Sequence, residues 1–354
     1  MMKKHMICGK GLTKTLRIRN ILNIAIENKA SDIFIIAGRP ISYKVMGDII
    51  SYNNILLTVK DTYEIIKDTF EIANKDDFNI LSSEGEIDFS FSVSQLGRFR
   101  VSAYLQRNSY AAVIRVVFFN LPNPIELGIP NNVIDLYKKQ KGLVLITGPA
   151  GSGKSTTLAC IVDKINSERN CHIMTFEDPI EFIHNHRKSI VSQREIPTDS
   201  KSYINSLKSC LRQAPDVILI GEMRDLETIE IALTAAETGH LVLSSLHTMG
   251  AANTIDRIID VFPANQQQQV RVQLSMQLQA VVSQQLIQSP VCGRVAAFEI
   301  MHVNNAVSNL IRESKIHQLN SVIHGNENNG MKSMDSSIIE LYKNNLISKE
   351  NALM

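Results

Sequence analysis

The chain has 354 residues, of which 44% are hydrophobic and 20% are charged, so it can build substantial cores. Its formal charge of +2, from 37 basic and 35 acidic side chains, gives no overall signature of nucleic-acid binding. No apolar run approaches the roughly 18 residues that a membrane span needs. Five scattered cysteines without a C-x-x-C pair are typical of a reducing cytoplasm and offer no zinc site. We expect a cytoplasmic protein.

The chain divides by composition into four parts. Residues 1–12 are predicted to be a loose leader without the apolar segment of a secretory signal. Residues 13–118 begin with helical spacing and continue with alternating strands, which predicts a small α+β domain. Proline-rich residues 119–130 are predicted to be a linker or hinge. Residues 131–354 alternate strands and helices, which predicts an α/β domain with a mostly parallel sheet, and from residue 266 on the pattern is mainly helical.

One stretch carries the clearest chemistry. An apolar run over residues 143–146 is predicted to be a buried strand, and it leads into a glycine-rich loop and then a helix near Lys154. This order of strand, loop and helix is typical of a phosphate-binding loop, in which backbone N–H groups converge on a phosphate. Lys154 is expected to reach the β- and γ-phosphates, and the Ser155 hydroxyl to bind Mg²⁺. The predicted ATP-binding residues of the loop are Gly148, Pro149, Ala150, Gly151, Ser152, Gly153, Lys154, Ser155 and Thr156.

A second apolar run, residues 217–220, ends at Gly221 and Glu222. A carboxylate at the end of such a strand fits a Walker B segment that reaches the metal site or the attacking water. Asp216 lies at the start of this strand, so Glu222 is the better candidate for the catalytic base. Glu222 could equally cap an ordinary strand if the phosphate loop were absent.

Two further segments place polar groups near strand ends. Glu177, Asp178 and Glu181 would hold a metal ion or its waters, and a solvated acidic turn is the alternative. His240 and His247 flank an apolar strand whose end could sense the γ-phosphate. Histidines in such positions can also be purely structural.

Several long motifs together resemble the ATPases of the type II secretion and type IV pilus superfamily. They are the phosphate loop, TFEDPIEFIH, the segment from LRQAPDVILIGEMRD to SSLHT, and NTIDRIIDVFP. GRVAAFEIM and the segment from SNLIRESKIHQLN to GMKSMD resemble the pilus retraction ATPases in particular. The resemblance implies a PAS-like N-terminal domain, a RecA-like P-loop ATPase domain, and a homohexamer with ATP sites at domain and subunit clefts.

The resemblance also implies roles for single residues. Glu222 matches the catalytic glutamate, Glu181 is favoured for metal contact within the acidic box, and His240 and His247 match the histidine box. Arg98, Arg100 and Arg115 lie where the family uses arginines to contact nucleotide phosphates during domain closure, a task suited to the guanidinium. Alone on alternating strands, such arginines would more often be solvated. Arginines in family-matching stretches with expected roles in subunit contacts are Arg212, Arg224, Arg257 and Arg294.

The resemblance therefore predicts an Mg²⁺-dependent hexameric motor ATPase that powers type IV pilus retraction and twitching motility. It would act without nucleic acid on a platform protein of the inner membrane, from its cytoplasmic face. Assembly and type II secretion ATPases are the alternative, although they usually carry a longer N-terminal region and a tetracysteine element. Rival classes are a DNA-translocating RecA-like motor and a nucleotide-gated scaffold without turnover. Two departures from the retraction family are Ser308 in place of an arginine and His302 in place of a glycine, the latter expected to alter only a loop.

Overall fold

The computed structural model describes residues 14–45, 47–94, 96–117 and 121–353. The predicted leader, residues 1–12, and the first two residues of the predicted linker lie outside the described residues. The described chain forms two compact units, one within residues 1–119 and one within residues 120–354. Each unit has its own hydrophobic core, so each is described separately.

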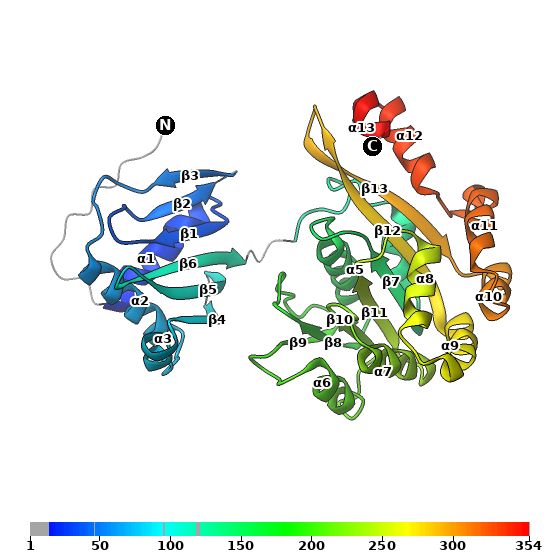
Figure 1. Ribbon diagram of the computed structural model, residues 1–354, viewed down its shortest axis with the longest axis horizontal. Helices are drawn as coiled ribbons and strands as arrows, with labels where there is room; N and C mark the ends of the chain where they lie inside the picture. The colour runs from blue at the N-terminus through cyan, green and yellow to red at the C-terminus, as the bar shows by residue number, and fades with distance from the viewer. Residues whose placement is uncertain (1–13, 46, 95, 118–120, 354) are drawn as a thin grey trace. The chain divides into compact units, whose positions relative to one another are not determined.

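The first unit is a six-stranded antiparallel sheet with helices (Figure 1). The strand order is β3-β2-β1-β6-β5-β4. The strands are β1 (Asp32–Ile35), β2 (Ser42–Val45), β3 (Asp48–Ser51), β4 (Glu86–Val93), β5 (Gly97–Gln106) and β6 (Ser109–Val117). The helices are α1 (Lys14–Glu27), α2 (Val59–Ile72) and α3 (Phe78–Glu84). This is the α+β arrangement predicted from the sequence; its PAS-like character stays a prediction.

Local sequence explains how α2 begins and which face of the sheet is buried. Thr58 and Asp61 form a capping box, in which each side chain accepts a hydrogen bond from the other residue's backbone N–H. Phe70 of α2 packs with Phe89 and Phe99 of the sheet in one core. The alternation of strand residues leaves the intervening side chains on the other face.

The second unit is a seven-stranded sheet in the order β13-β12-β7-β11-β10-β8-β9, parallel except for the edge strand β13. The strands are β7 (Gly142–Thr147), β8 (His172–Glu177), β9 (Ile190–Glu195), β10 (Val217–Ile220), β11 (Leu241–Leu246), β12 (Leu278–Ser289) and β13 (Gly293–His302). The α-helices are α4 (Asn131–Ile134), α5 (Lys154–Glu168), α6 (Tyr203–Cys210), α7 (Leu226–Glu237), α8 (Ala251–Asp260), α9 (Ala264–Gln277), α10 (Asn305–Arg312), α11 (Leu319–Gly325), α12 (Met334–Lys343) and α13 (Lys349–Leu353). Short 3₁₀ turns occupy Asp135–Lys138, Ile316–Gln318 and Glu327–Asn329.

Strand β7 lies between two cores. All six of its residues are buried, as the apolar run predicted. Leu143 and Leu145 face one core with α7, α8 and α9, whereas Val144 and Ile146 face the other with α5. A parallel sheet covered on both faces is the doubly wound arrangement, and its ligands bind at the carboxyl ends of the strands. The predicted α/β fold with a P-loop domain is confirmed.

The helices α9 to α13 agree with the mainly helical pattern expected after residue 266, but one element was missed. This part of the chain also contains the long hairpin of β12 and β13, which the sequence pattern did not predict. Pairing with β7 over residues 278–283 extends the sheet and overrides the local pattern of a glutamine-rich segment. His302, expected in a loop, is the last residue of β13 and pairs with Ala280. Across the described part of the chain, no helix is both long enough and apolar enough to span a membrane.

Candidate nucleotide-binding site

The glycine-rich loop connects β7 to α5 at the carboxyl edge of the sheet. Gly148 and Gly153 have φ angles of +136° and +89°, which favour glycine. A Cβ at Gly148 would lie 2.1 Å from the carbonyl oxygen of Gln284, and one at Gly153 would lie 2.9 Å from the Gln284 side-chain nitrogen. Glycine is therefore required at both ends of the loop. The helix that follows begins at Lys154, as predicted.

Lys154 is buried at the N-terminus of α5. Its ammonium donates hydrogen bonds to the carbonyl oxygens of Gly148 and Pro149, both at 2.9 Å, and lies 3.4 Å from Nδ1 of His247. Burial lowers the pKa of Lys154, while Glu222 and Glu181 oppose that shift. The loop carbonyls thus hold the ammonium beside the space that a phosphate group would take.

A pocket of about 240 Å³ opens beside the loop. It is lined by residues from the ends of four strands, β7, β8, β10 and β11, which the parallel arrangement brings to one edge. The predicted site residues that line it are Ala150, Gly151, Lys154, Ser155, Glu177, Asp178, Glu181, Glu222 and His247. Tyr203 and His184 also line it, and sequence reasoning missed both.

Glu222 lies two residues beyond β10, and its carboxylate contacts the side chains of Arg224 and His247. Arg224 Nη2 lies 2.5 Å from its Oε1, and His247 Nε2 lies 3.1 Å from its Oε2. Burial alone would raise the pKa of Glu222, but the hydrogen bonds from Arg224 and His247 lower it overall. The carboxylate is therefore held ionised, 15% exposed, in the pocket wall.

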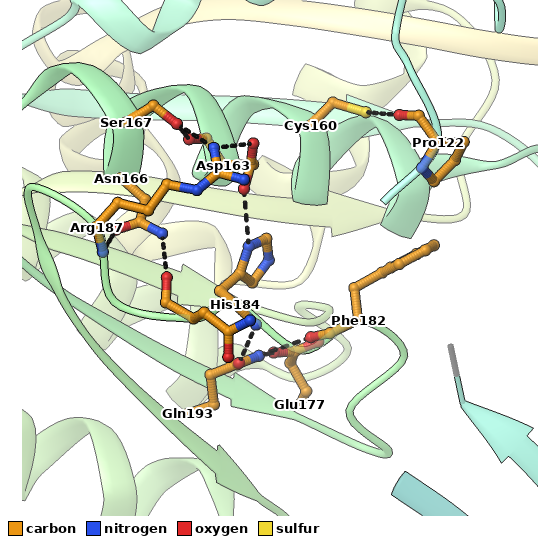
Figure 2. A network of polar contacts seen from close by, with 11 residues as sticks. Pro122, Cys160, Asp163, Asn166, Ser167, Glu177, Phe182, His184, Arg187 and Gln193 are labelled. Carbon is orange, nitrogen blue, oxygen red and sulfur yellow. Dashed lines mark hydrogen bonds and ion pairs between the residues drawn. The ribbon is translucent and has the colours of Figure 1, made fainter. Parts of the chain in front are cut away.

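The segment between β8 and β9 carries Glu181 and is fixed to both neighbouring elements (Figure 2). On the β9 side, Gln193 donates to Glu177 Oε1 at 3.3 Å and to the Phe182 carbonyl at 2.9 Å. Its own side-chain oxygen accepts from the backbone N–H of His184 at 2.8 Å. Glu177 also accepts from Thr175, and burial raises the pKa of Glu177 to about 7.

On the α5 side, Asn166 is fully buried. Its amide donates to the Asn185 carbonyl at 2.7 Å, and its side-chain oxygen accepts from Arg187 N at 3.1 Å. Asp163 lies 3.1 Å from Arg187 Nη1 and 4.0 Å from His184 Nδ1. Figure 2 draws both contacts as dashed lines. The acidic segment is thus connected directly to the helix that follows the phosphate loop. In the sequence, the polar residues Asp163 and Asn166 within the predicted helix are the one sign of this connection.

His240 does not reach the pocket within a single chain. His240 precedes β11, whereas His247 follows it. The two histidines therefore lie at opposite ends of this strand, separated by about 20 Å at the usual rise per residue. The His240 ring contacts the Ala235 carbonyl and Thr238 instead. The prediction that His240 binds ATP is therefore not supported by the fold of one chain. Asp216 lies, like His240, at the amino ends of the strands, where its carboxylate accepts a hydrogen bond from the backbone N–H of His172.

The three predicted arginines of the first unit share one face of its sheet. Arg98 and Arg100 are two residues apart on β5, so their side chains point to the same face of the sheet. Arg100 lies directly opposite Arg115 of β6. Arg100 lies 3.4 Å from Asp88, and Arg115 lies 3.0 Å from Asp32. The four predicted arginines of the second unit are all exposed, and of the four Arg224 alone lines the pocket; they are Arg212, Arg224, Arg257 and Arg294.

The pocket fits a divalent cation shared with a nucleotide. The Ser155 hydroxyl and the Glu181 carboxylate are hard oxygen donors of the kind that Mg²⁺ prefers. Among the described residues, no group of three or more His, Cys, Asp or Glu side chains is arranged to hold a metal ion. Mg²⁺ in nucleotide sites usually takes one or two protein ligands and completes its shell with phosphate oxygens and water, so this donor set is sufficient.

A doubly wound sheet with a glycine-rich loop at its carboxyl edge, facing an ionised glutamate, defines a P-loop nucleotide-binding protein. The chain belongs to the Type II/IV secretion system protein family, whose model matches residues 10–340. This membership confirms the superfamily of P-loop ATPases that the sequence motifs indicated.

Two relatives and one solved structure are similar over most of their length. The chain is 45% identical to the type IV pilus retraction ATPase PilT of Pseudomonas aeruginosa, over 95% of this chain and 96% of that one. It is 50% identical to a twitching motility protein of Neisseria gonorrhoeae, over 75% and 72% of the two chains. A crystal structure of the pilus retraction motor PilT with bound ADP superposes with a TM-score of 0.87 at 44% identity, covering 97% of this chain and 96% of that chain.

Proposed function

We propose that this protein is an Mg²⁺-dependent ATPase motor that powers retraction of a type IV pilus. One observation carries the proposal: Lys154 of the phosphate loop and Glu222 meet at one pocket, with His247 between them. Its support is the 45% identity to the pilus retraction ATPase PilT over nearly the whole of both chains.

The residues of the pocket supply the groups that ATP hydrolysis needs. Lys154 and the loop N–H groups would hold the phosphates, with the ammonium exchanging its carbonyl partners for phosphate oxygens. Ser155 and Glu181 would hold Mg²⁺, which neutralises charge on the triphosphate when bound. Glu222, held ionised, would accept a proton from the attacking water.

Mechanical work would come from movement between the two units about the linker, residues 119–130. We propose a homohexamer in which Arg98, Arg100 and Arg115 contact nucleotide phosphates when the units close. In that assembly the motor would act on a platform protein at the inner face of the cell membrane. A contact of His240 with nucleotide would likewise require a neighbouring copy.

The alternatives differ in what they predict for the purified protein. A DNA-translocating motor would hydrolyse ATP faster when DNA is added, whereas a retraction motor would not. A nucleotide-gated scaffold would bind ATP without turnover. A pilus assembly or type II secretion ATPase would hydrolyse ATP but would fail to restore retraction in cells.

The test has two parts. Steady-state ATP hydrolysis of the purified protein, with and without Mg²⁺ and DNA, is measured together with oligomeric mass. Pilus retraction is then measured in Pseudomonas aeruginosa lacking PilT and supplied with this chain. We expect Mg²⁺-dependent, DNA-independent hydrolysis by a hexamer, and restored retraction. Hydrolysis with no restored retraction, although the chain is expressed, would contradict the retraction function and favour the assembly or secretion alternative.

A further inference from the structure

Strand β12 runs directly behind the phosphate loop. It pairs in parallel with β7, and Ser283 lies opposite Thr147, the last residue of β7. The next residue, Gln284, is therefore level with the start of the loop. Gln284 is 4% exposed, which is unusual for a glutamine and calls for hydrogen-bond partners.

Gln284 contacts both ends of the loop and the helix beyond it. Its Oε1 accepts a hydrogen bond from the hydroxyl of Thr157, on the first turn of α5, at 2.7 Å. Its carbonyl oxygen and its Nε2 lie against Gly148 and Gly153, at distances that leave no room for a Cβ. The loop is thus enclosed from behind by one residue of a different strand.

The neighbouring residue, Ser283, contacts the segment of residues 247–251, which follows β11 and begins with His247. Ser283 Oγ accepts from the backbone N–H of Gly250 at 3.0 Å. Glu299, which pairs with Ser283 across the hairpin, accepts from the N–H of Ala251 at 2.7 Å. These two bonds cap α8, whose own N-cap residue supplies no side-chain bond, and they fix the segment that begins at His247.

We infer that Gln284 is a positioning residue of the nucleotide site. It fixes the phosphate loop in the shape that binds phosphate, and Ser283 fixes the segment that carries His247. The β12–β13 hairpin is in this way the common support of both segments. The inference rests on the proposed function, because it names residues that hold the proposed ATP site in its binding geometry.

The first test is a double-mutant cycle on the Gln284–Thr157 bond. Gln284→Met and Thr157→Val keep side-chain volume and remove one partner each; Gln285→Met changes the next residue, which alternates to the other face of β12. Affinity for a fluorescent ATP analogue and the fraction of active sites are measured for each variant. We expect each single variant to bind roughly tenfold more weakly, because a buried partner is left unsatisfied and the loop loses its fixed geometry.

Three further results decide the inference. The double variant should bind no more weakly than the worse single variant, since both substitutions remove the same bond. Thr157→Ser, which keeps the hydroxyl, should restore affinity, and Gln285→Met should bind as the wild type does. Unchanged affinity in Thr157→Val, or losses that simply add, would overturn the inference even if Gln284→Met failed to fold. No ATP binding by the wild type would instead contradict the proposed function.

The second test separates the two residues kinetically. Ser283→Ala removes the acceptor for Gly250 and should lower kcat with little change in KM, because His247 faces Glu222 and the reacting end of the nucleotide. Gln284→Met should mainly raise KM. A purely structural role would lower the active fraction of both variants alike and leave kcat and KM of the remaining enzyme unchanged, which would overturn the assignment.

Discussion

His247 and Glu222 are hydrogen-bonded across the nucleotide pocket, with Nε2 of the histidine 3.1 Å from Oε2 of the glutamate. On the other side of the ring, Nδ1 lies 3.4 Å from the Lys154 ammonium. Since an ammonium can only donate and a carboxylate can only accept, this arrangement suits Nδ1 as the acceptor from Lys154 and Nε2 as the donor to Glu222. The ring therefore connects the residue expected to contact phosphate with the residue expected to activate water.

The first prediction concerns the carboxylate of Glu222. Glu222→Gln keeps the shape and removes the proton acceptor, so we expect ATP turnover to fall about 100-fold or more, the usual scale for loss of a general base. Nucleotide binding should be retained, because the phosphate-contacting groups are unchanged. Turnover and analogue binding are measured side by side. Glu227→Gln, the same change at an exposed position of α7, is the control and should behave as the wild type does. Equal turnover in both variants would remove Glu222 from the chemistry.

The second prediction concerns the pH dependence of turnover. Arg224 and His247 together lower the pKa of Glu222 against the effect of burial, so the carboxylate stays ionised into the acidic range. In Arg224→Gln the pKa of Glu222 rises, because burial is then opposed by His247 alone. The acidic limb of the kcat/KM profile should therefore move to higher pH. Arg312→Gln, at another exposed arginine of the same unit, should leave the profile in place; an unmoved profile in Arg224→Gln as well would contradict the assignment.

The third prediction concerns the support of the acidic segment. Asn166→Ala removes the donor to Asn185 and the acceptor for Arg187, leaving two part-buried backbone groups without a side-chain partner. We expect a loss of roughly 1–3 kcal/mol in the free energy of unfolding, from two lost hydrogen bonds of roughly 0.5–1.5 kcal/mol each. Thermal unfolding measures it. Asn170→Ala, at an exposed asparagine just beyond α5, is the control, and a loss of equal size there would show that the network contributes nothing specific.

The sequence predicted those features that depend on neighbouring residues along the chain. The buried strand β7, the glycine-rich loop and the start of α5 at Lys154 follow from apolar runs, positive-φ glycines and helix N-terminal chemistry within a short segment. The acid after β10 was found for the same reason. Each of these signals is local, so no knowledge of the sheet order was needed.

Features that depend on the sheet order could not be predicted in this way. Gln284 and Thr157 are 127 residues apart, and a glutamine beside another glutamine in a strand carries no local sign of a buried partner. The hairpin of β12 and β13 was not predicted within a part of the chain expected to be mainly helical, because its strand character comes from pairing with β7. The resemblance predicted His240 at the site, but His240 lies at the amino end of β11, whereas the pocket lies at the carboxyl ends of the strands.

The last prediction concerns the buried His184, which lies on the acidic segment 4.0 Å from Asp163. Burial lowers the pKa of His184 to about 4 from its usual 6.5, with Asp163 opposing the shift and Arg187 adding to it. The folded protein thus holds a neutral ring at a pH where the unfolded chain already binds a proton. Stability is fully present above the unfolded pKa and is lost as pH falls from 6.5 towards about 4.

The size of the effect follows from the two pKa values. Between pH 7 and pH 5 the wild type should lose about 2 kcal/mol in the free energy of unfolding through this one ring. His184→Gln cannot bind that proton, so its unfolding should depend less on pH by about the same amount. Thermal and urea unfolding of both proteins at pH 7 and pH 5 measure the difference, and other titrating groups cancel between them. His186→Gln, at an exposed histidine of the same segment, is the control. If His184→Gln lost stability with falling pH as steeply as the wild type, His184 would not be the group that makes the acidic segment sensitive to pH.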